Sequence, residues 1–386
     1  MQNQKSSISK ANLLGFLLFI IIIIETAFEN TELQFYDLRV NRIIFLGEAI
    51  IFLLDLAMCK YSKKSLVIIF SLFVAFLGSY FLLGTTVLLK MYILSVVISK
   101  CDYTQTFKVL WMIKILALII VIFSALIGII GVNSMSVAKG REHFAYGYGL
   151  GYTHPNRLGS ALLYILMCYL CYRNERLKKH QLCVVVLISI VAFAITKCRT
   201  LIFCVALFCV FYYLYKSRYF REIVKRVIRI VGPCSVPICV GMSIGFPFLL
   251  MRSSGIVQKV VYFINLMFNR RFTHIEWAFL TYPVTLAGGN YDFSSLEEKF
   301  GYAIIDNGYI RFLYNYGILG LTMFALLTTV CLFLLVRRQK YLYVVICTII
   351  AIQGMIENIY VYIGFNILVV FWSELFRNHD RNSSVY

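Results

Sequence analysis

Long stretches of almost uninterrupted apolar residues constrain this chain more than any other feature. Residues 13–24 and 201–214 are two of them, and neither contains a charged side chain. The composition agrees, because 61% of the residues are hydrophobic and 14% are charged, whereas a soluble domain has about 25% charged residues. A helix of about 20 apolar residues is long enough to span a bilayer. We therefore expect an all-α integral membrane protein.

Apolar runs of that length, separated by short turns, predict a bundle of about twelve transmembrane helices. The predicted spans are 12–28, 43–59, 65–82, 85–99, 109–131, 156–172, 181–196, 200–216, 230–250, 311–336, 341–356 and 359–376. Only Gly84-Thr85-Thr86 separates the third span from the fourth, so the count holds to within two. No linker is evident among the five prolines and few Gly/Ser-rich stretches, so residues 1–386 are expected to form a single polytopic domain.

Short loops rich in Lys and Arg indicate the orientation. The segments 173–180, 217–229 and 337–340 are dense in cations, and such loops stay on the cytoplasmic side. Both termini are then expected to be cytoplasmic. The formal net charge of +19 follows these loops, so we expect no nucleic-acid partner. Glu25 and Glu29 follow the first apolar stretch in place of small residues, which argues against a cleavable signal peptide.

Two extracytoplasmic loops are predicted to be long, 132–155 and 251–310, and the second precedes the tenth span. Apolar residues at helical spacing across 257–283 predict helices at the outer membrane interface, with Trp277 at the level of the headgroups. A loop of this length with its own apolar content is more often functional than not.

A histidine opens the sixth predicted span, in the sequence Thr153-His154-Pro155-Asn156. Thr153 or Asn156 could cap this helix, whose N-terminal amides favour an anion. His154 could act as a base, as an acid or as a hydrogen-bond donor to a diphosphate. The alternative is a capping turn with a solvated histidine.

Basic side chains occur at two other outer positions. Lys197 and Arg199 lie in the turn between the seventh and eighth spans, and Arg270 and Arg271 lie in the long loop. Each pair could simply contact lipid headgroups. Arginine, however, binds phosphate through two parallel hydrogen bonds and keeps its charge at any pH. Arginines from separate segments would suit a diphosphate.

The tenth span is preceded by Asp306-Asn307-Gly308-Tyr309. Asp306 could be the N-cap of that span, or a carboxylate that takes a proton from a sugar hydroxyl.

Charged residues also occur inside or beside the predicted spans, where charge is expensive and must pair or face water. They are Glu48, Asp55, Lys90, Lys114 and Glu357. We expect Glu48 and Asp55 to pair with Lys90 or Lys114, the alternative being an ion path. Most of the twelve cysteines lie in spans without zinc-site spacing and are expected to be packing residues. The chain lacks the Asp-x-Asp pair that holds a metal in nucleotide-sugar transferases, so a transferase of this sequence is not expected to use a nucleotide sugar as its donor. We expect no metal or cofactor.

These motifs together resemble the Wzy-type polysaccharide polymerases of the O-antigen ligase/polymerase superfamily, which share the architecture of about twelve spans with a large late outer loop. The resemblance lies in residues 153–159, in 196–200, in 269–272 with Trp277 and 286–289, and in 306–309 with Leu313, Gly317 and Gly320. Cys198 stands where the family has serine, and which arginine, Arg270 or Arg271, fills the family position is open. Related ligases carry a histidine in place of Asp306, so His154 or His274 would supply any imidazole.

The resemblance implies a metal-independent glycosyltransferase in the bacterial cytoplasmic membrane. It would join undecaprenyl-diphosphate-linked oligosaccharide repeat units into capsular polysaccharide or exopolysaccharide at the outer face. A chain-length regulator and a flippase of the same pathway would be its partners. The resemblance implies three catalytic residues, Asp306, His154 and Arg199. The substrate-binding residues that it implies are Arg270, Arg271, Asn156, Asn307, Tyr309, Trp277 and His274.

Two alternatives remain. A lipid-linked oligosaccharide flippase would line a central cavity with its arginines and would use the charges inside the spans. An O-antigen-ligase-like transferase would use nearly the same site with a different acceptor.

Overall fold

The computed structural model describes residues 10–34, 38–59, 61–138, 144–301 and 305–377, which form a bundle of helices with one small hairpin. The first helices are α1 (Lys10–Glu25), α2 (Leu38–Met58), α3 (Lys63–Leu83), α4 (Val87–Ile98), α5 (Tyr103–Leu126) and α6 (Pro155–Arg173). They are followed by α7 (Lys179–Thr196), α8 (Arg199–Lys216), α9 (Arg221–Arg252), α10 (Gly255–Met267), α11 (Arg271–Thr281), α12 (Ser294–Phe300), α13 (Gly308–Arg337), α14 (Tyr341–Ile356) and α15 (Leu368–Trp372). The antiparallel strands are β1 (Ser134–Ala138) and β2 (Phe144–Tyr148).

Long apolar helices confirm the all-α class and indicate a membrane-embedded protein. Within the described residues, six helices are long and apolar enough to cross a membrane, namely α3, α5, α7, α8, α9 and α13. Large apolar side chains remain exposed along them; Phe70 and Phe81 on α3 are 68% and 76% exposed. Extended apolar surfaces of this kind are rare on soluble monomers. Since α1, α4 and α14 are shorter, the count of twelve spans stays a prediction.

The twelfth predicted span, 359–376, is wrong as a single helix. This segment consists of 3₁₀ turns at Ile363–Phe365 and Ser373–Leu375 on either side of the short α15. It is enclosed by protein, and its polar backbone groups find partners there: Gly364 N–H donates to the Glu29 carboxylate at 2.7 Å. Irregular backbone is tolerated at membrane depth only where protein surrounds it.

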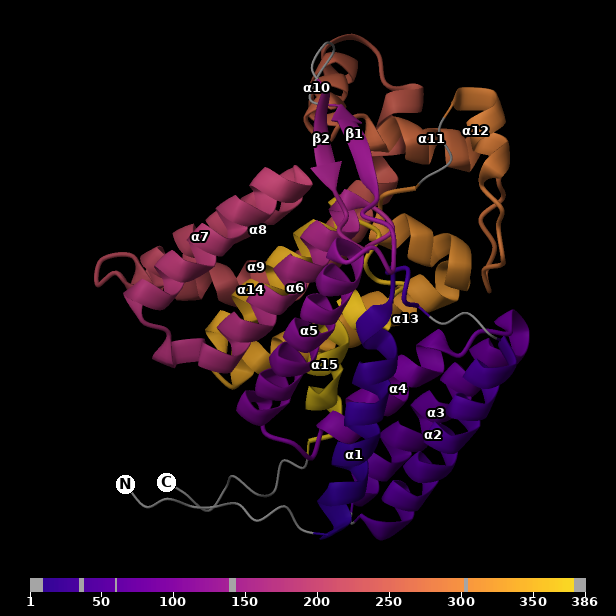
Figure 1. Cartoon of the computed structure of the whole chain (residues 1–386), viewed down its shortest axis with the longest axis vertical. Coiled ribbons are helices and arrows are strands. Elements are labelled where there is room, and N and C mark those ends of the chain that lie inside the picture. The colour runs from indigo at the N-terminus through magenta and orange to yellow at the C-terminus, as the bar shows by residue number, and fades with distance from the viewer. Residues whose placement is uncertain (1–9, 35–37, 60, 139–143, 302–304, 378–386) are drawn as a thin grey trace.

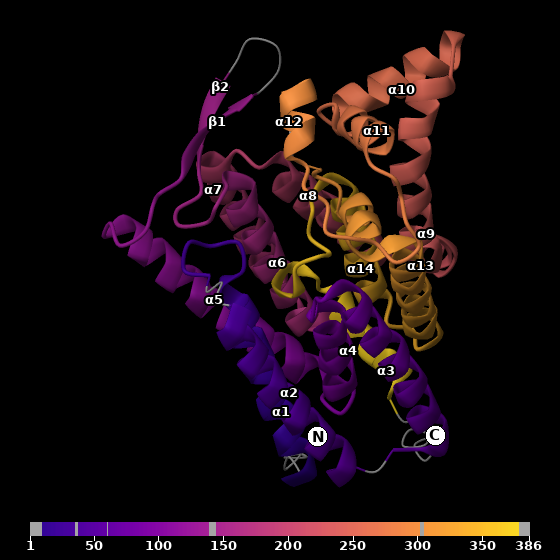
Figure 2. The ribbon, with the colours of Figure 1, turned by 90° about the vertical axis from the view of Figure 1, so that its right-hand side faces the viewer.

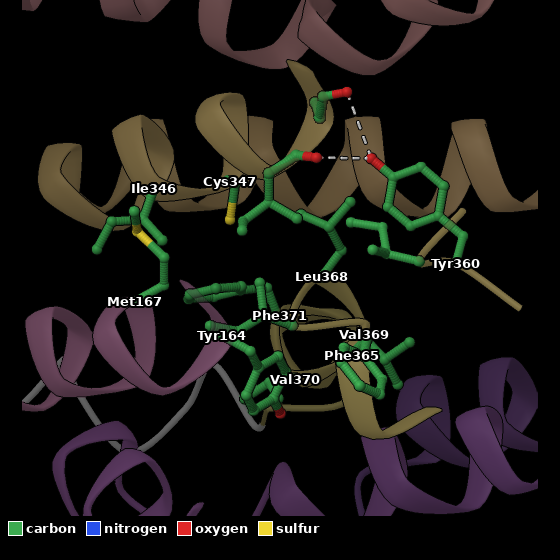
Figure 3. Packing of buried hydrophobic residues seen from close by; sticks show 14 of the residues in the cluster. Tyr164, Met167, Ile346, Cys347, Tyr360, Phe365, Leu368, Val369, Val370 and Phe371 are labelled. Atoms are coloured by element: carbon green, nitrogen blue, oxygen red, sulfur yellow. Dashed lines mark hydrogen bonds between the residues drawn. The ribbon is translucent and has the colours of Figure 1, made fainter. Parts of the chain in front are cut away.

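Figure 3 shows how tightly this last segment packs. Its apolar side chains lie against those of α6 and α14 in one continuous core. The labelled residues are Tyr164, Met167, Ile346, Cys347, Tyr360, Phe365, Leu368, Val369, Val370 and Phe371. The apolar sequence that suggested a transmembrane helix therefore packs in the centre of the bundle.

The hairpin and the short helices α10, α11 and α12 lie at the end of the molecule opposite to the beginning of α1 (Figure 1 and Figure 2). The longest helix, α9, packs against α13, α14 and α11. It begins at Arg221, so part of the predicted cytoplasmic segment 217–229 is already helical.

Both of the long predicted loops contain secondary structure in their described residues. The segment 132–155 contains the hairpin, which pairs Ser134 with Tyr148 and Ala138 with Phe144. The segment 251–310 contains α10, α11 and α12, so the helical pattern predicted across 257–283 is confirmed.

Charges inside the helices form ion pairs with one another. Lys90 lies 2.5 Å from Glu25 and 3.2 Å from Glu48, as predicted for Glu48. Asp55 instead pairs with Lys100, which corrects the expected pairing with Lys90 or Lys114. The reason is position, because Asp55 near the end of α2 and Lys100 after the end of α4 reach the same side of the bundle.

Candidate functional site

A cavity of about 420 Å³ opens where the ends of several helices meet. Its wall combines cations, a carboxylate, amides and apolar side chains. The lining residues are Asn156, Lys197, Arg199, Thr200, Phe203, Met267, Phe268, Asn269, Arg271, Ile352, Ile356 and Glu357. They come from the start of α6, the α7–α8 turn, the α10–α11 corner and the end of α14.

The α7–α8 turn supplies the first two cations. Lys197 ends α7 in a left-handed conformation with φ 57°, and its N–H donates to Phe193 O at 2.8 Å. Cys198 is buried in the turn, and a Cβ atom on Gly159 of α6 would lie 2.5 Å from the Cys198 Cβ. Only glycine permits so close an approach. This packing brings Lys197 and Arg199 beside Asn156 at the cavity wall.

His154 is the N-cap of α6, which corrects the expectation that Thr153 or Asn156 caps this helix. Its Nδ1 accepts from Asn156 N–H at 3.0 Å. Pro155 at the first helical position has no N–H, so the amide of Asn156 is the first one that needs an acceptor. With Nδ1 occupied in this way, the neutral imidazole carries its proton on Nε2 and acts as a donor there.

Burial lowers the pKa of His154. The nearby Asp306 carboxylate opposes this shift, and the charges of Arg157 and Arg271 add to it. The His154 imidazole is therefore neutral near pH 7, and burial is the main cause.

Arg271 is the arginine that the fold directs into the cavity. The chain reverses between α10 and α11, where Asn269 and Arg270 adopt left-handed conformations with φ 53° and 58°. Asn265 is buried and pins this corner, because its Oδ1 accepts from Phe272 N–H at 3.1 Å and its Nδ2 donates to Thr273 Oγ1 at 2.7 Å.

The Arg271 guanidinium bridges two carboxylates. It lies 3.5 Å from Asp306 Oδ2 and 3.4 Å from Glu357 Oε1. Its side chain is 12% exposed, whereas Arg270 is exposed and does not line the cavity. Geometry thus separates two neighbours that the sequence left equivalent.

Glu357 is the cavity residue whose place the sequence did not reveal. The sequence marks it only as an expensive charge beside a span. Its side chain is 3% exposed and reaches both Arg271 and Thr200, whose hydroxyl donates to Oε1 at 3.1 Å. A carboxylate at the end of an otherwise apolar helix was the one available signal. It fixes the position of the Arg271 guanidinium.

Asn307, and not Asp306, is the N-cap of α13. Its Oδ1 accepts from the N–H groups of Tyr309 and Ile310 at 3.0 Å each, and its Nδ2 donates to Ser243 Oγ and Met355 O. The Asp306 carboxylate is consequently available to Arg271. Asn307 and Tyr309 are fully buried and do not line the cavity; Tyr309 donates to Ala351 O at 2.9 Å.

His274 and Trp277 lie further along α11, with their ring centres 5.3 Å apart, and neither lines the cavity. Burial lowers the pKa of His274 to about 4, although the Asp306 carboxylate works in the opposite direction. Within the described residues, no three His, Cys, Asp or Glu side chains form a group that could hold a metal ion.

Comparison with known proteins finds no match: no family model, no curated protein and no solved structure is significantly similar to this chain.

Proposed function

We propose that this protein is a polysaccharide polymerase, which joins undecaprenyl-diphosphate-linked repeat units at the outer face of a bacterial cytoplasmic membrane. The observation that carries the proposal is the convergence of Lys197, Arg199 and Arg271 on one cavity from two separate segments. Three of the four motifs that resemble the polymerase family contribute to this wall, and the fourth contributes Asp306, the partner of Arg271.

The helix directions support an outward-facing cavity. α6, α8 and α13 begin at the cavity end and finish at Arg173, Lys216 and Arg337, where the short cationic loops follow. Because loops of this kind stay in the cytoplasm, the opposite ends of the same helices face outward.

The cavity suits a lipid diphosphate in both of its chemical parts. The guanidinium groups of Arg199 and Arg271 would hold the phosphates. Phe203, Met267 and Phe268 give the wall an apolar side, against which the first isoprenoid units would lie. In the proposed orientation the cavity lies at the outer face of the membrane, where such a substrate would arrive.

In the proposed reaction, a sugar hydroxyl of one lipid-linked unit attacks the anomeric carbon of the glycan on another. The bond between that carbon and the diphosphate oxygen breaks, and undecaprenyl diphosphate leaves with the bonding electrons. The hydroxyl proton passes to Asp306, while neutral His154 donates from Nε2 to a substrate oxygen. The cations stabilise the charge that develops on the departing diphosphate.

The charged residues inside the bundle support a flippase less well than a polymerase, because they pair with one another away from the cavity. Lys90 is held by Glu25 and Glu48, and Lys100 by Asp55, and none of these residues lines the cavity. The arginines gather at helix ends instead of along a central path.

Deletion of the encoding gene, followed by analysis of lipid-linked intermediates, tests the proposal. A polymerase predicts accumulation of single repeat units on the outer leaflet, restored to polymer by the wild-type chain and not by Arg199→Ala. Accumulation on the inner leaflet would instead identify a flippase. Polymer that forms normally but stays on its lipid would identify a ligase.

A further inference from the structure

One line of partly exposed residues runs along α14. Thirteen of its sixteen residues are buried, and the three that are not are Thr348, Ile352 and Ile356. These residues are spaced four apart, so they lie one above another on a single face of the helix. Protein therefore covers α14 on every side except along this line.

Apolar residues of α8 follow the same spacing beside α14, against which α8 packs. They are Phe203, Leu207 and Phe211; Phe203 is 48% exposed, and the other two are partly exposed. α9 packs against both of these helices, and its Val231 is 43% exposed. The exposed line of α14 thus lies among three packed helices.

Two cavities mark the ends of this line. The cavity of the candidate site is lined by Phe203 and Ile356, among others. A second cavity, of about 30 Å³, is lined by Phe211, Thr348 and Val231, so that α8, α14 and α9 all contribute to it. Eight residues separate Phe203 from Phe211 and also Ile356 from Thr348, which is about 12 Å along a helix axis. Both helices therefore place the second cavity at the same distance from the first.

We call the stretch between the two cavities the apolar slot, and it begins at a cation. Arg199 precedes Phe203 by four residues and lines the same cavity, so a guanidinium group and an apolar stripe follow each other along one face of α8. α8 runs from the cavity end to Lys216, beside a cationic loop. In the proposed orientation the slot extends from the outer face toward the middle of the bilayer. A lipid diphosphate has the same order of parts, phosphates first and then hydrocarbon.

We propose that the apolar slot holds the isoprenoid chain of the lipid diphosphate whose phosphates bind Arg199 and Arg271. This inference rests on the proposed function and extends it beyond the first isoprenoid units. The slot is one residue wide on α14, which suits the single chain of an isoprenoid lipid and not the two chains of a phospholipid. Because lipid surrounds the protein, close packing along the chain holds it in place, and exclusion of water contributes little.

Photocrosslinking at two depths tests the slot. Phe203 and Phe211 are each replaced by benzoylphenylalanine in the full chain, which is placed in phosphatidylcholine nanodiscs and irradiated with radiolabelled undecaprenyl diphosphate or geranyl diphosphate. The long lipid is expected to label both positions. Geranyl diphosphate is expected to label Phe203 and to give about tenfold less labelling at Phe211, because its two isoprenoid units end short of the second cavity.

Phe70 on α3 is the matched control, since it carries the same side chain at 68% exposure on a helix that lines neither cavity. Excess unlabelled undecaprenyl diphosphate should displace the labelling at Phe211 and leave any labelling at Phe70 unchanged. The double variant Arg199→Gln/Arg271→Gln should lower labelling at Phe211, which a nonspecific apolar surface would not show. If the Phe211 variant does not fold, benzoylphenylalanine at Thr348 on the facing helix gives the same measurement.

The outcomes separate this inference from the proposed function. Labelling of Phe203 without Phe211, or labelling of Phe211 that unlabelled undecaprenyl diphosphate does not displace, overturns the slot and leaves the cavity as a diphosphate site. Absence of displaceable labelling at Phe203, in a chain with both arginines intact, contradicts the proposed function itself.

Discussion

Arg270 and Arg271 are adjacent in the sequence and have opposite surroundings. Arg270 is exposed in a left-handed turn, whereas Arg271 opens α11, lines the cavity and contacts Asp306 and Glu357. The difference arises from the chain reversal between α10 and α11. Asn265 stabilises this reversal through its hydrogen bonds to Phe272 and Thr273. No local pattern in the sequence distinguishes the two side chains.

The two arginines form a matched pair for mutagenesis. Arg271→Gln is expected to lower polymer formation by about 100- to 1000-fold, the usual effect of removing one group that stabilises developing negative charge. Arg270→Gln should leave activity within about twofold, since exposed substitutions away from a site have small effects. Both are measured as polymer produced in a gene-deletion strain at equal membrane levels of protein. Equal losses in the two variants would remove Arg271 from the site.

His274 makes stability depend on pH. Its pKa is lowered in the folded protein to about 4 from the ordinary 6.5, so between these values the unfolded chain binds a proton that the folded chain does not. As far as His274 is concerned, the free energy of unfolding is highest above about pH 6.5 and falls as the pH decreases toward 4. The melting temperature in nanodiscs should therefore drop over this window.

His274→Asn should reduce that drop, and His180→Asn, at an exposed position on α7, should leave it unchanged. A pH dependence that is identical in wild type and His274→Asn would contradict the assignment.

Among the elements, the segment between α11 and α12 and the kink of α13 depend on each other. Gly317 breaks the helix with φ 70° and ψ −176°, and the backbone groups released there bind the loop: Ile318 N–H donates to Thr285 O and Leu319 N–H to Leu286 O, at 3.1 Å each. A Cβ atom at Gly317 would collide with the Leu286 carbonyl oxygen. The kink thus attaches the segment that follows α11 to α13.

Gly317→Ala is expected to destabilise the protein by about 1–3 kcal/mol from backbone strain alone, and more from the collision. Its melting temperature in nanodiscs should fall clearly below that of wild type. The control is Gly245→Ala on α9, where an added methyl group meets open space. If the two variants melt together, the loop does not depend on the kink.

Helix positions were largely predictable from the sequence, because apolar length and cationic turns are local properties. The last predicted span failed for a physical reason: an apolar segment enclosed by protein has the same composition as one that faces lipid, and only the surroundings of Gly364 and its neighbours distinguish them. The helix caps could not be predicted either, since local geometry makes His154 and Asn307 the N-caps in place of Thr153 and Asp306.

The site shows the same limit. Sequence reasoning selected Asn156, Arg199 and Arg271, which do line one cavity, but placed Asn307 and Tyr309 with them although both are buried in the core. The cavity exists only because helix ends far apart in the chain meet, and such contacts leave no trace in a single sequence.

In the whole molecule, the proposed function requires the cavity and the cationic loops to face opposite sides of the membrane. Asn290 lies in the loop beyond α11 and is exposed. Tyr219, 90% exposed, lies between α8 and α9. The two positions therefore report the two sides.

Labelling of added cysteines measures this orientation. Above the wild-type background, Asn290→Cys should react with a membrane-impermeant maleimide in intact cells, and Tyr219→Cys should react only after permeabilisation. The reverse pattern would place the cavity in the cytoplasm and rule out the proposed use of externally presented substrate.

Glycan elongation by the purified chain tests the proposed function most directly. The chain is reconstituted in proteoliposomes with lipid-linked repeat units isolated from the deletion strain, without nucleotide sugar and in the presence of a metal chelator. Lipid-linked glycans are expected to lengthen in steps of one repeat unit, with one undecaprenyl diphosphate released for each linkage formed. Unchanged single units, or polymer that appears only after a metal ion or nucleotide sugar is added, would contradict the proposed function.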